Sequence, residues 1–246
     1  MPINKRDILI EAFTDMAPDY EHKVDSELNK LWGWNYQGFL NELLSKTPIF
    51  ENDLILDVAT GTGVISHHLA KNGLSKNLIH ALDITYPMLK QTRKRFEKSK
   101  IEDKSALVCA SAMEMPYQEN VFDLVICGLA THHMNVENFI SETNRILTSN
   151  GRLSIIDVGG SLNWRIPGIK SIIRILAYFY FLMTENHSRA WAESASISNI
   201  RAKEEWETLL TKSGFNNLEI VKLSSKNWFI PSPLFIRAVK KSGGNE

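Results

Sequence analysis

Short apolar runs alternate with amphipathic segments between residues 54 and 158. The runs are continuous and rich in Val, Ile and Leu, which is typical of strands buried on both faces of a parallel sheet. The segments between them carry apolar residues at helical spacing. We predict strands at Leu54–Val58, Asn77–Asp83, Ala106–Ala110, Phe122–Gly128 and Arg152–Val158, and helices at Val64–Asn72, Pro87–Lys98 and Val136–Leu147.

The flanking segments complete an α/β pattern. Helices are predicted over residues 5–46, and the end of the chain predicts helices at Ile169–Met183 and Ala202–Ser213 and strands at Leu218–Leu223 and Leu234–Val239. We expect one α/β domain over residues 1–246, with a doubly wound, mostly parallel seven-stranded sheet and helices on both faces. Residues 1–46 would form a helical lid and residues 160–200 a helical substrate-cap insertion. The ligand should lie beyond the carboxyl ends of the strands, beside the first strand.

The composition is that of a globular protein, and the charge balance limits the classes of partner that it can be expected to bind. Hydrophobic residues make up 43% of the 246 positions, and 28 basic residues balance 28 acidic ones. A net charge of zero argues against a nucleic-acid partner. Cys109 and Cys127 both lie in apolar runs, so we expect two buried thiols rather than a disulfide.

No segment predicts secretion or membrane insertion. The stretch from Met1 to Phe13 lacks an apolar core followed by a small-residue cleavage site. The longest apolar stretch, Ile172–Met183, is interrupted by Arg174 and is too short to span a bilayer. We therefore expect a cytoplasmic protein that acts on a small molecule without stable membrane insertion. The sequence leaves a homodimer open.

A glycine turn, Asp57-Val58-Ala59-Thr60-Gly61-Thr62-Gly63, joins the first strand to the next helix. Its glycines allow a sharp turn and a close approach of a ligand to the main chain. The second strand ends at Asp83, and an acidic side chain at that position can accept hydrogen bonds from both hydroxyls of a ribose. The turn therefore predicts an adenosine-containing ligand.

Two positions separate this turn from the dinucleotide-binding fingerprint. Ser66 stands where that fingerprint has its third glycine, and Asp57 precedes Gly61 by four residues. A carboxylate at the mouth of the site would repel a pyrophosphate but would attract an ammonium or a sulfonium group. The pattern therefore favours S-adenosylmethionine (SAM) over a nicotinamide dinucleotide.

The segment Ala110–Tyr117, followed by Phe122-Asp123-Leu124-Val125, resembles the corresponding stretch of class I SAM-dependent methyltransferases. Within that family, the glycine turn is most similar to that of the quinone-biosynthesis C-methyltransferases. Two positions depart from the family pattern: Ala59 stands where most members have glycine, and Ser111 where an acidic residue is usual. The segment Ala12–Tyr20 is similar to the part of such enzymes that folds over the cofactor as a lid.

The resemblance implies SAM as cofactor, with S-adenosylhomocysteine as product. It places the cofactor site at Asp57, Ala59, Thr60, Gly61, Gly63, Asp83, Ile84, Met88, Ser111, Ala112, Met113, Cys127, Gly128 and Leu129. The expected reaction is methyl transfer to a carbon or oxygen of a small hydrophobic or aromatic molecule, because the Asn-Pro-Pro-Tyr signature of amino-methylating enzymes is missing. The alternative is a SAM-binding protein that uses the cofactor structurally and methylates nothing.

A histidine pair, His132-His133, follows the fourth strand at the edge where the ligand should lie. A histidine beside the reacting methyl group could remove a proton from the nucleophile, or it could have only a structural role. We take His132, His133 and Tyr20 as the catalytic candidates, with His187 and Asp157 next. No metal is expected, because adjacent side chains should diverge and no further ligand completes a set.

The apolar segment Ile169–Met183 allows three interpretations. The simplest is a helix buried under a cap. The second is a hydrophobic wall for the substrate. The third is an interfacial helix that turns Arg165, Lys170 and Arg174 toward lipid headgroups.

Overall fold

Seven strands form one sheet in the computed structural model, which describes residues 5–242. Their order is β3-β2-β1-β4-β5-β7-β6, and β1 to β5 run parallel while β7 is antiparallel to both of its neighbours. The strands are β1 (Ile55–Val58), β2 (Ile79–Asp83), β3 (Ser105–Cys109), β4 (Phe122–Gly128), β5 (Leu147–Asp157), β6 (Phe215–Lys222) and β7 (Leu234–Lys240). The predicted doubly wound, mostly parallel seven-stranded sheet is confirmed.

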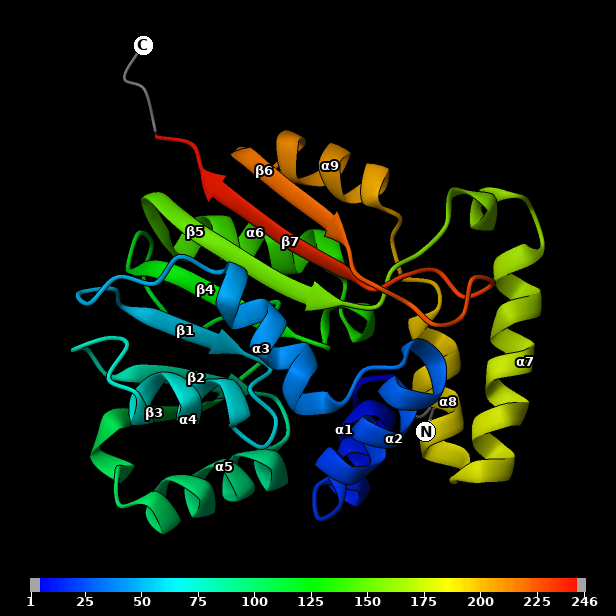
Figure 1. The fold of residues 1–246 in the computed structure, drawn as a ribbon, viewed down its shortest axis with the longest axis horizontal. Coiled ribbons are helices and arrows are strands. Elements are labelled where there is room, and N and C mark those ends of the chain that lie inside the picture. The colour runs from blue at the N-terminus through cyan, green and yellow to red at the C-terminus, as the bar shows by residue number, and fades with distance from the viewer. Residues whose placement is uncertain (1–4, 243–246) are drawn as a thin grey trace.

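Helices cover both faces of the sheet and gather at the carboxyl ends of its parallel strands (Figure 1). In chain order they are α1 (Lys5–Met16), α2 (Tyr20–Trp32), α3 (Tyr36–Lys46), α4 (Val64–Lys71), α5 (Tyr86–Ser99), α6 (Val136–Ile146), α7 (Ile169–Thr184), α8 (His187–Ser196) and α9 (Lys203–Lys212). Short 3-10 turns add η1 (Glu102–Lys104), η2 (Thr131–His133) and η3 (Leu162–Arg165). Because α1, α2, α7 and α8 lie beyond the strand ends, they enclose the region where a ligand is expected.

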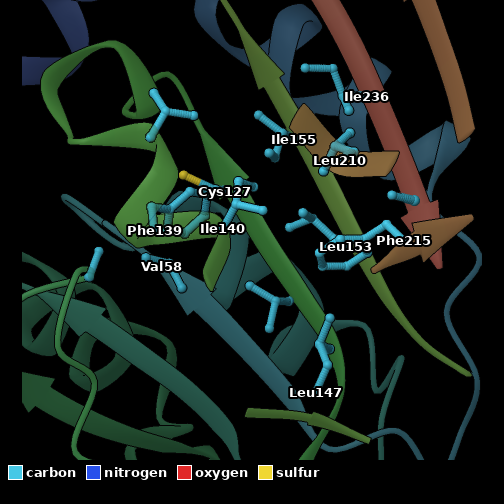
Figure 2. Packing of buried hydrophobic residues seen from close by; sticks show 14 of the residues in the cluster. Val58, Cys127, Phe139, Ile140, Leu147, Leu153, Ile155, Leu210, Phe215 and Ile236 are labelled. Carbon is cyan, nitrogen blue, oxygen red and sulfur yellow. The ribbon is translucent and has the colours of Figure 1, made fainter. Parts of the chain in front are cut away.

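The hydrophobic core has one part on each face of the sheet. Figure 2 shows the part in which Phe139 of α6 and Leu210 of α9 pack on strand residues such as Val58 and Leu153. On the other face, residues of α3 and α4 pack against β1 and β4. All four residues of β1 are buried, as expected for a central strand covered on both sides.

The structure corrects three expectations: the burial of α7, the burial of Cys109, and the number of helices in the insertion. Helix α7 is not buried, since none of its residues is fully shielded from solvent. Cys109 is exposed because it ends the edge strand β3, whereas Cys127 is buried in β4. Helix α8 was not singled out within the predicted insertion. Among residues 5–242, no helix combines the length and the hydropathy needed to cross a bilayer.

Phe139 provides a test of the core. It is fully buried between α6 and the sheet, so Phe139→Ala should lower the free energy of unfolding by about 3–5 kcal/mol. Urea denaturation would measure the change. Leu78→Ala, at a half-exposed position, is the control and should change stability by no more than about 0.5 kcal/mol. Equal effects of the two substitutions would contradict this description of the core.

Candidate active site

The two glycines of the turn after β1 have different surroundings. Both have left-handed backbone conformations, with φ of +57° at Gly61 and +76° at Gly63. A Cβ on Gly63 would lie 2.4 Å from Cγ2 of Thr92 in α5. A Cβ on Gly61 would meet, among residues 5–242, only the Tyr20 ring, at 3.8 Å. Gly63 is therefore needed for close helix packing, and Gly61 presents its bare main chain to a pocket.

Asp83 forms the acidic wall of this pocket. Its carboxylate accepts hydrogen bonds from the backbone N–H of Gly61, at 2.9 Å, and of Thr85, at 2.7 Å. Burial raises the pKa of Asp83 to about 6, although both backbone hydrogen bonds act to lower it. Each carboxylate oxygen retains a further lone pair, so the group can still accept hydrogen bonds from a ligand.

Asp57 lies behind the turn and holds it to α4. Its Oδ2 accepts hydrogen bonds from Thr60 Oγ1, at 2.6 Å, and from Ser66 Oγ, at 2.5 Å. Its Oδ1 is buried and has no hydrogen-bond partner within residues 5–242. Burial raises the pKa of Asp57 to about 6. A nearby cation would therefore stabilise the ionised form of this carboxylate.

The Gly61 pocket, as we call the first cavity, brings together nine of the fourteen predicted cofactor residues. These are Ala59, Gly61, Asp83, Ile84, Met88, Ser111, Ala112, Met113 and Leu129. Asp57, Thr60, Gly63, Cys127 and Gly128 do not line it. The sequence prediction missed Leu9, Leu82, Thr85, Ala130 and Met134. All except Leu9 stand next to or near a predicted site residue in the chain, and proximity to Asp83 or to the histidine pair is the signal that could have found them.

A second cavity, the α7 cavity, opens beside the first with a volume of about 770 Å³. Its walls are apolar and include Ile173, Ala177 and Phe181 of α7. Its polar lining is concentrated in one group of side chains: Glu27, His132, His133, Arg189 and Glu193. Phe13, Tyr20, Leu129 and His133 line both cavities, so the two cavities meet at these residues.

His132 is held by Asp157 at the end of β5. Its Nδ1 lies 2.6 Å from Asp157 Oδ1, and its backbone N–H donates to Oδ2 of the same carboxylate at 3.1 Å. Burial alone would lower the pKa of His132, but the charge of Asp157 and its hydrogen bond outweigh this effect and raise the pKa above 6.5. Asp157 thus fixes the orientation of the ring, so that Nε2 is the nitrogen left for other partners.

His133 lies in a different environment from its neighbour. Its Nε2 is 3.4 Å from Glu193 Oε1, and its buried Nδ1 has no hydrogen-bond partner in the described part of the chain. Burial, together with the adjacent His132, lowers the pKa of His133. The Phe13 ring packs edge-on against it at 5.0 Å. His133 is therefore a neutral imidazole at neutral pH.

The histidine rings do not diverge, so that part of the sequence-based argument against a metal was wrong. Their centroids are 4.1 Å apart, and Glu193 joins them so that one ligand atom from each residue lies within 4.8 Å of the others. These three residues could hold a metal ion. However, Glu193 already pairs with Arg189 at 2.8 Å, and a guanidinium beside a ligand carboxylate competes with a metal cation. The absence of a metal stays a prediction.

Arg189 is the central residue that sequence reasoning missed. It is buried in α8 and forms ion pairs with Glu27 of α2, at 3.0 Å, and with Glu193. Burial acts to raise the pKa of Glu193, but the charge of Arg189 and the hydrogen bond from His133 outweigh it and hold that pKa well below its usual range. The side chain of Asn186 accepts from the backbone N–H of Arg189, and this helix-capping pattern is the signal that could have located α8.

The catalytic candidates Tyr20 and His187 differ in their position relative to the two cavities. Tyr20 is buried at the junction of the two cavities, and burial raises the pKa of its hydroxyl. His187 lines neither cavity and stands against Tyr178, with ring centroids 6.1 Å apart. The structure therefore places all three primary candidates at the cavities and excludes His187 from their walls.

A family model described as "Methyltransferase domain" matches residues 56–155. The demethylmenaquinone methyltransferase of Lactobacillus johnsonii is 26% identical over 218 residues, which is 87% of each chain. The ubiquinone/menaquinone biosynthesis C-methyltransferase of Agrobacterium fabrum is 30% identical over 159 residues, which is 62% of this chain and 59% of that one.

Solved structures share the fold at low sequence identity. The geranyl diphosphate C-methyltransferase of Streptomyces coelicolor, in complex with Mg²⁺, a substrate analogue and S-adenosylhomocysteine, superposes with a TM-score of 0.65 and 15% identity, covering 90% of this chain and 81% of that one. The [4+2]-cyclase SpnF superposes with a TM-score of 0.64 and 15% identity, covering 85% and 83% of the two chains. These likenesses establish the architecture alone.

The matched domain and its relatives define the class of protein: residues 56–155 form a methyltransferase domain, and the chain is a SAM-dependent methyltransferase. In sequence it resembles the quinone-biosynthesis methyltransferases. Its cofactor is SAM. The Gly61 pocket fits that cofactor, because a bare main chain and an acidic side chain suit a ribose and apolar walls suit an adenine. Asp57, expected at the mouth of the site, is instead fully buried behind the turn and does not line the pocket.

Asp83→Asn tests the ribose contact. The substitution keeps the size of the side chain but replaces a charged acceptor with a neutral one, so SAM affinity should fall about tenfold or more. Calorimetric titration would measure the dissociation constant. Asp103→Asn on the exposed turn η1 is the control and should bind like the parent. Unchanged affinity in a folded Asp83→Asn variant would exclude Asp83 from the site.

The acidic groups also predict a pH dependence. Because the pKa of both Asp57 and Asp83 is raised to about 6 in the folded protein, both become neutral as the pH falls through that value. SAM affinity should therefore fall between about pH 7 and about pH 5, by no more than about tenfold per pH unit for each group. Titrations across this range would show the loss, and Asp57→Asn should make it shallower. Affinity independent of pH would contradict the prediction.

Proposed function

We propose that the protein transfers the methyl group of SAM to a carbon or oxygen nucleophile of a small hydrophobic or aromatic molecule. The observation that carries this proposal is the junction of the two cavities. The Gly61 pocket fits the cofactor, and the α7 cavity shares Phe13, Tyr20, Leu129 and His133 with it. A molecule in the α7 cavity would therefore reach the same residues as the cofactor.

The α7 cavity indicates the chemical class of the acceptor. Apolar side chains of α2 and α7 would enclose a hydrophobic body, and the cluster around Arg189 and the two histidines would receive a polar head. The names of the relatives from L. johnsonii and A. fabrum refer to quinone biosynthesis, and one of them specifies methylation at carbon. We therefore favour a hydroxylated aromatic ring or quinol methylated at a ring carbon.

The chain's own residues would supply alignment, a proton acceptor and shielding from water. SAM, when bound, supplies a methyl group already activated by a positively charged sulfur. Holding a nucleophile in line with it can account for about 7–11 kcal/mol of barrier reduction. His132, oriented through Nδ1 by Asp157, would accept the proton of a substrate hydroxyl at Nε2.

The N-terminal helices and the insertion would act as parts of this site. Tyr20 begins α2 and lines both cavities, which supports a lid role for residues 1–46. Helix α7 contributes the apolar wall of the cavity, and α8 contributes Arg189 and Glu193. This division of roles supports residues 160–200 as the segment that selects the substrate.

The alternative is a SAM-binding protein that does not methylate. The [4+2]-cyclase SpnF, which shares the fold, is named for a reaction other than methyl transfer, and this supports keeping the alternative. Product analysis distinguishes the two. Incubation with SAM and a panel of phenols and quinols should yield S-adenosylhomocysteine and a methylated product, detected by mass spectrometry. Conversion of an acceptor without S-adenosylhomocysteine would support the alternative.

His132→Asn tests the proposed base. Turnover should fall about 10²–10⁴-fold, while SAM affinity stays near that of the parent because His132 does not line the Gly61 pocket. In the parent, turnover should fall as the pH drops below the raised pKa of His132, and this limb of the pH profile should disappear in the variant. His187→Ala, outside both cavities, is the control. A greater loss in the control would place the base elsewhere.

A further inference from the structure

Helix α7 has two apolar faces, and only one of them is used by the cavity. Ile173, Ala177 and Phe181 face the α7 cavity. Ile172, Ile175 and Phe179 recur at a spacing of three or four residues on another side of the helix, do not line the cavity, and are each more than half exposed. A helix with one apolar face toward a cavity and another toward solvent lacks a partner on its outer side.

Two segments close to α7 also expose apolar side chains. Ile166 follows η3, which contacts α7, and Trp228 lies in the loop between β6 and β7 that runs toward α7 in Figure 1. Trp228 is 94% exposed and Met183, near the end of α7, is 86% exposed. We call Ile166, Ile172, Ile175, Phe179, Met183 and Trp228 the α7 face.

The segments that carry the α7 face are basic, although the whole chain is neutral. Residues 158–184 and 220–233 contain Arg165, Lys170, Arg174, Lys222 and Lys226 but no Asp or Glu. Arg165 pairs with Glu205, and Lys170 donates to backbone carbonyls of residues 198 and 200. Arg174, Lys222 and Lys226 are exposed. The apolar surface is therefore accompanied by positive charge within a chain whose total is zero.

We propose that the α7 face docks on the surface of an anionic lipid bilayer. Apolar side chains of a surface helix enter the boundary between headgroups and acyl chains, and Trp is favoured at that depth. Lys and Arg near the surface gain from the negative potential of anionic lipids. Such docking is peripheral, and it places α7 between the bilayer and the cavity that it lines.

The charge of these segments favours a bilayer over a second copy of this chain. A two-fold symmetric dimer brings the same patch of both copies together, so the exposed Arg174, Lys222 and Lys226 of one copy would face the same three cations of the other. An anionic lipid surface offers the opposite sign over the whole contact. Complementary charge therefore selects lipid as the occupant.

Vesicle co-sedimentation of the full chain, without SAM or acceptor, tests the proposal. The protein should pellet with vesicles of phosphatidylcholine containing about 30% phosphatidylglycerol and much less with phosphatidylcholine alone. High salt should weaken the binding. The double substitution Met183→Glu and Trp228→Glu should abolish it, whereas Leu78→Glu, which introduces one acidic residue at a half-exposed apolar position before β2, should leave it intact.

A second pair of variants separates charge from hydrophobicity. Arg174→Ala and Lys226→Ala should each weaken binding to anionic vesicles about fivefold, whereas Arg93→Ala on the exposed side of α5 should not. Absence of vesicle binding, or binding that the Met183 and Trp228 substitutions leave unchanged, would overturn the proposal. So would a dimer, seen by sedimentation velocity, that these substitutions dissociate without any vesicle binding. Methyl transfer is not measured here, so neither result depends on the proposed substrate.

Discussion

One buried guanidinium connects the parts of this protein that come together at the carboxyl ends of the strands. Arg189 of α8 pairs with Glu27 of α2 and with Glu193, which in turn reaches His133 after β4. The rings of Phe13 and Phe181 lie 5.8 and 5.5 Å from the guanidinium carbon. Helices α1, α2, α7 and α8 therefore meet at this side chain, and Glu193 links the segment after β4 to it. Removing one partner of such a buried pair costs about 3–5 kcal/mol, because the other charge is left without compensation.

This constraint also explains why the site histidines have different properties. His133 belongs to the Arg189 cluster, where burial and neighbouring cations favour its neutral form and lower its pKa. His132 is hydrogen-bonded to Asp157, whose carboxylate favours the charged imidazolium and raises the pKa of His132. Two adjacent residues thus serve different purposes, because each is held by a carboxylate from a different element.

The strands of the sheet can be predicted from the sequence more completely than the residues that line the α7 cavity. Continuous apolar runs located the five parallel strands, and the predicted bounds of β4 match those in the structure. The start of β5 was placed too late, since Thr148, Ser149 and Asn150 are polar yet still belong to the strand. Local patterns find elements that are defined by neighbours in the chain.

The cavity depends on contacts between distant residues, which no local pattern encodes. Glu27 and Arg189 are 162 positions apart, and neither stands in a recognisable motif. The burial of α7 was equally beyond reach, because an apolar run at helical spacing suits a buried helix and a helix with an exposed face alike. Among the catalytic candidates, the histidines were found because they follow a strand whose end is predictable.

The buried charges near the two cavities do not cancel. Glu27, Glu193 and Asp157 contribute three carboxylates, whereas Arg189 contributes one positive charge, to which His132 adds a second only when it is protonated. Asp57 and Asp83 add further negative charge as they ionise. A low-dielectric site with an excess of carboxylates stabilises a cationic occupant more than a neutral one of the same shape. SAM carries a sulfonium and S-adenosylhomocysteine does not, so the same field that favours binding of the cofactor favours release of the product.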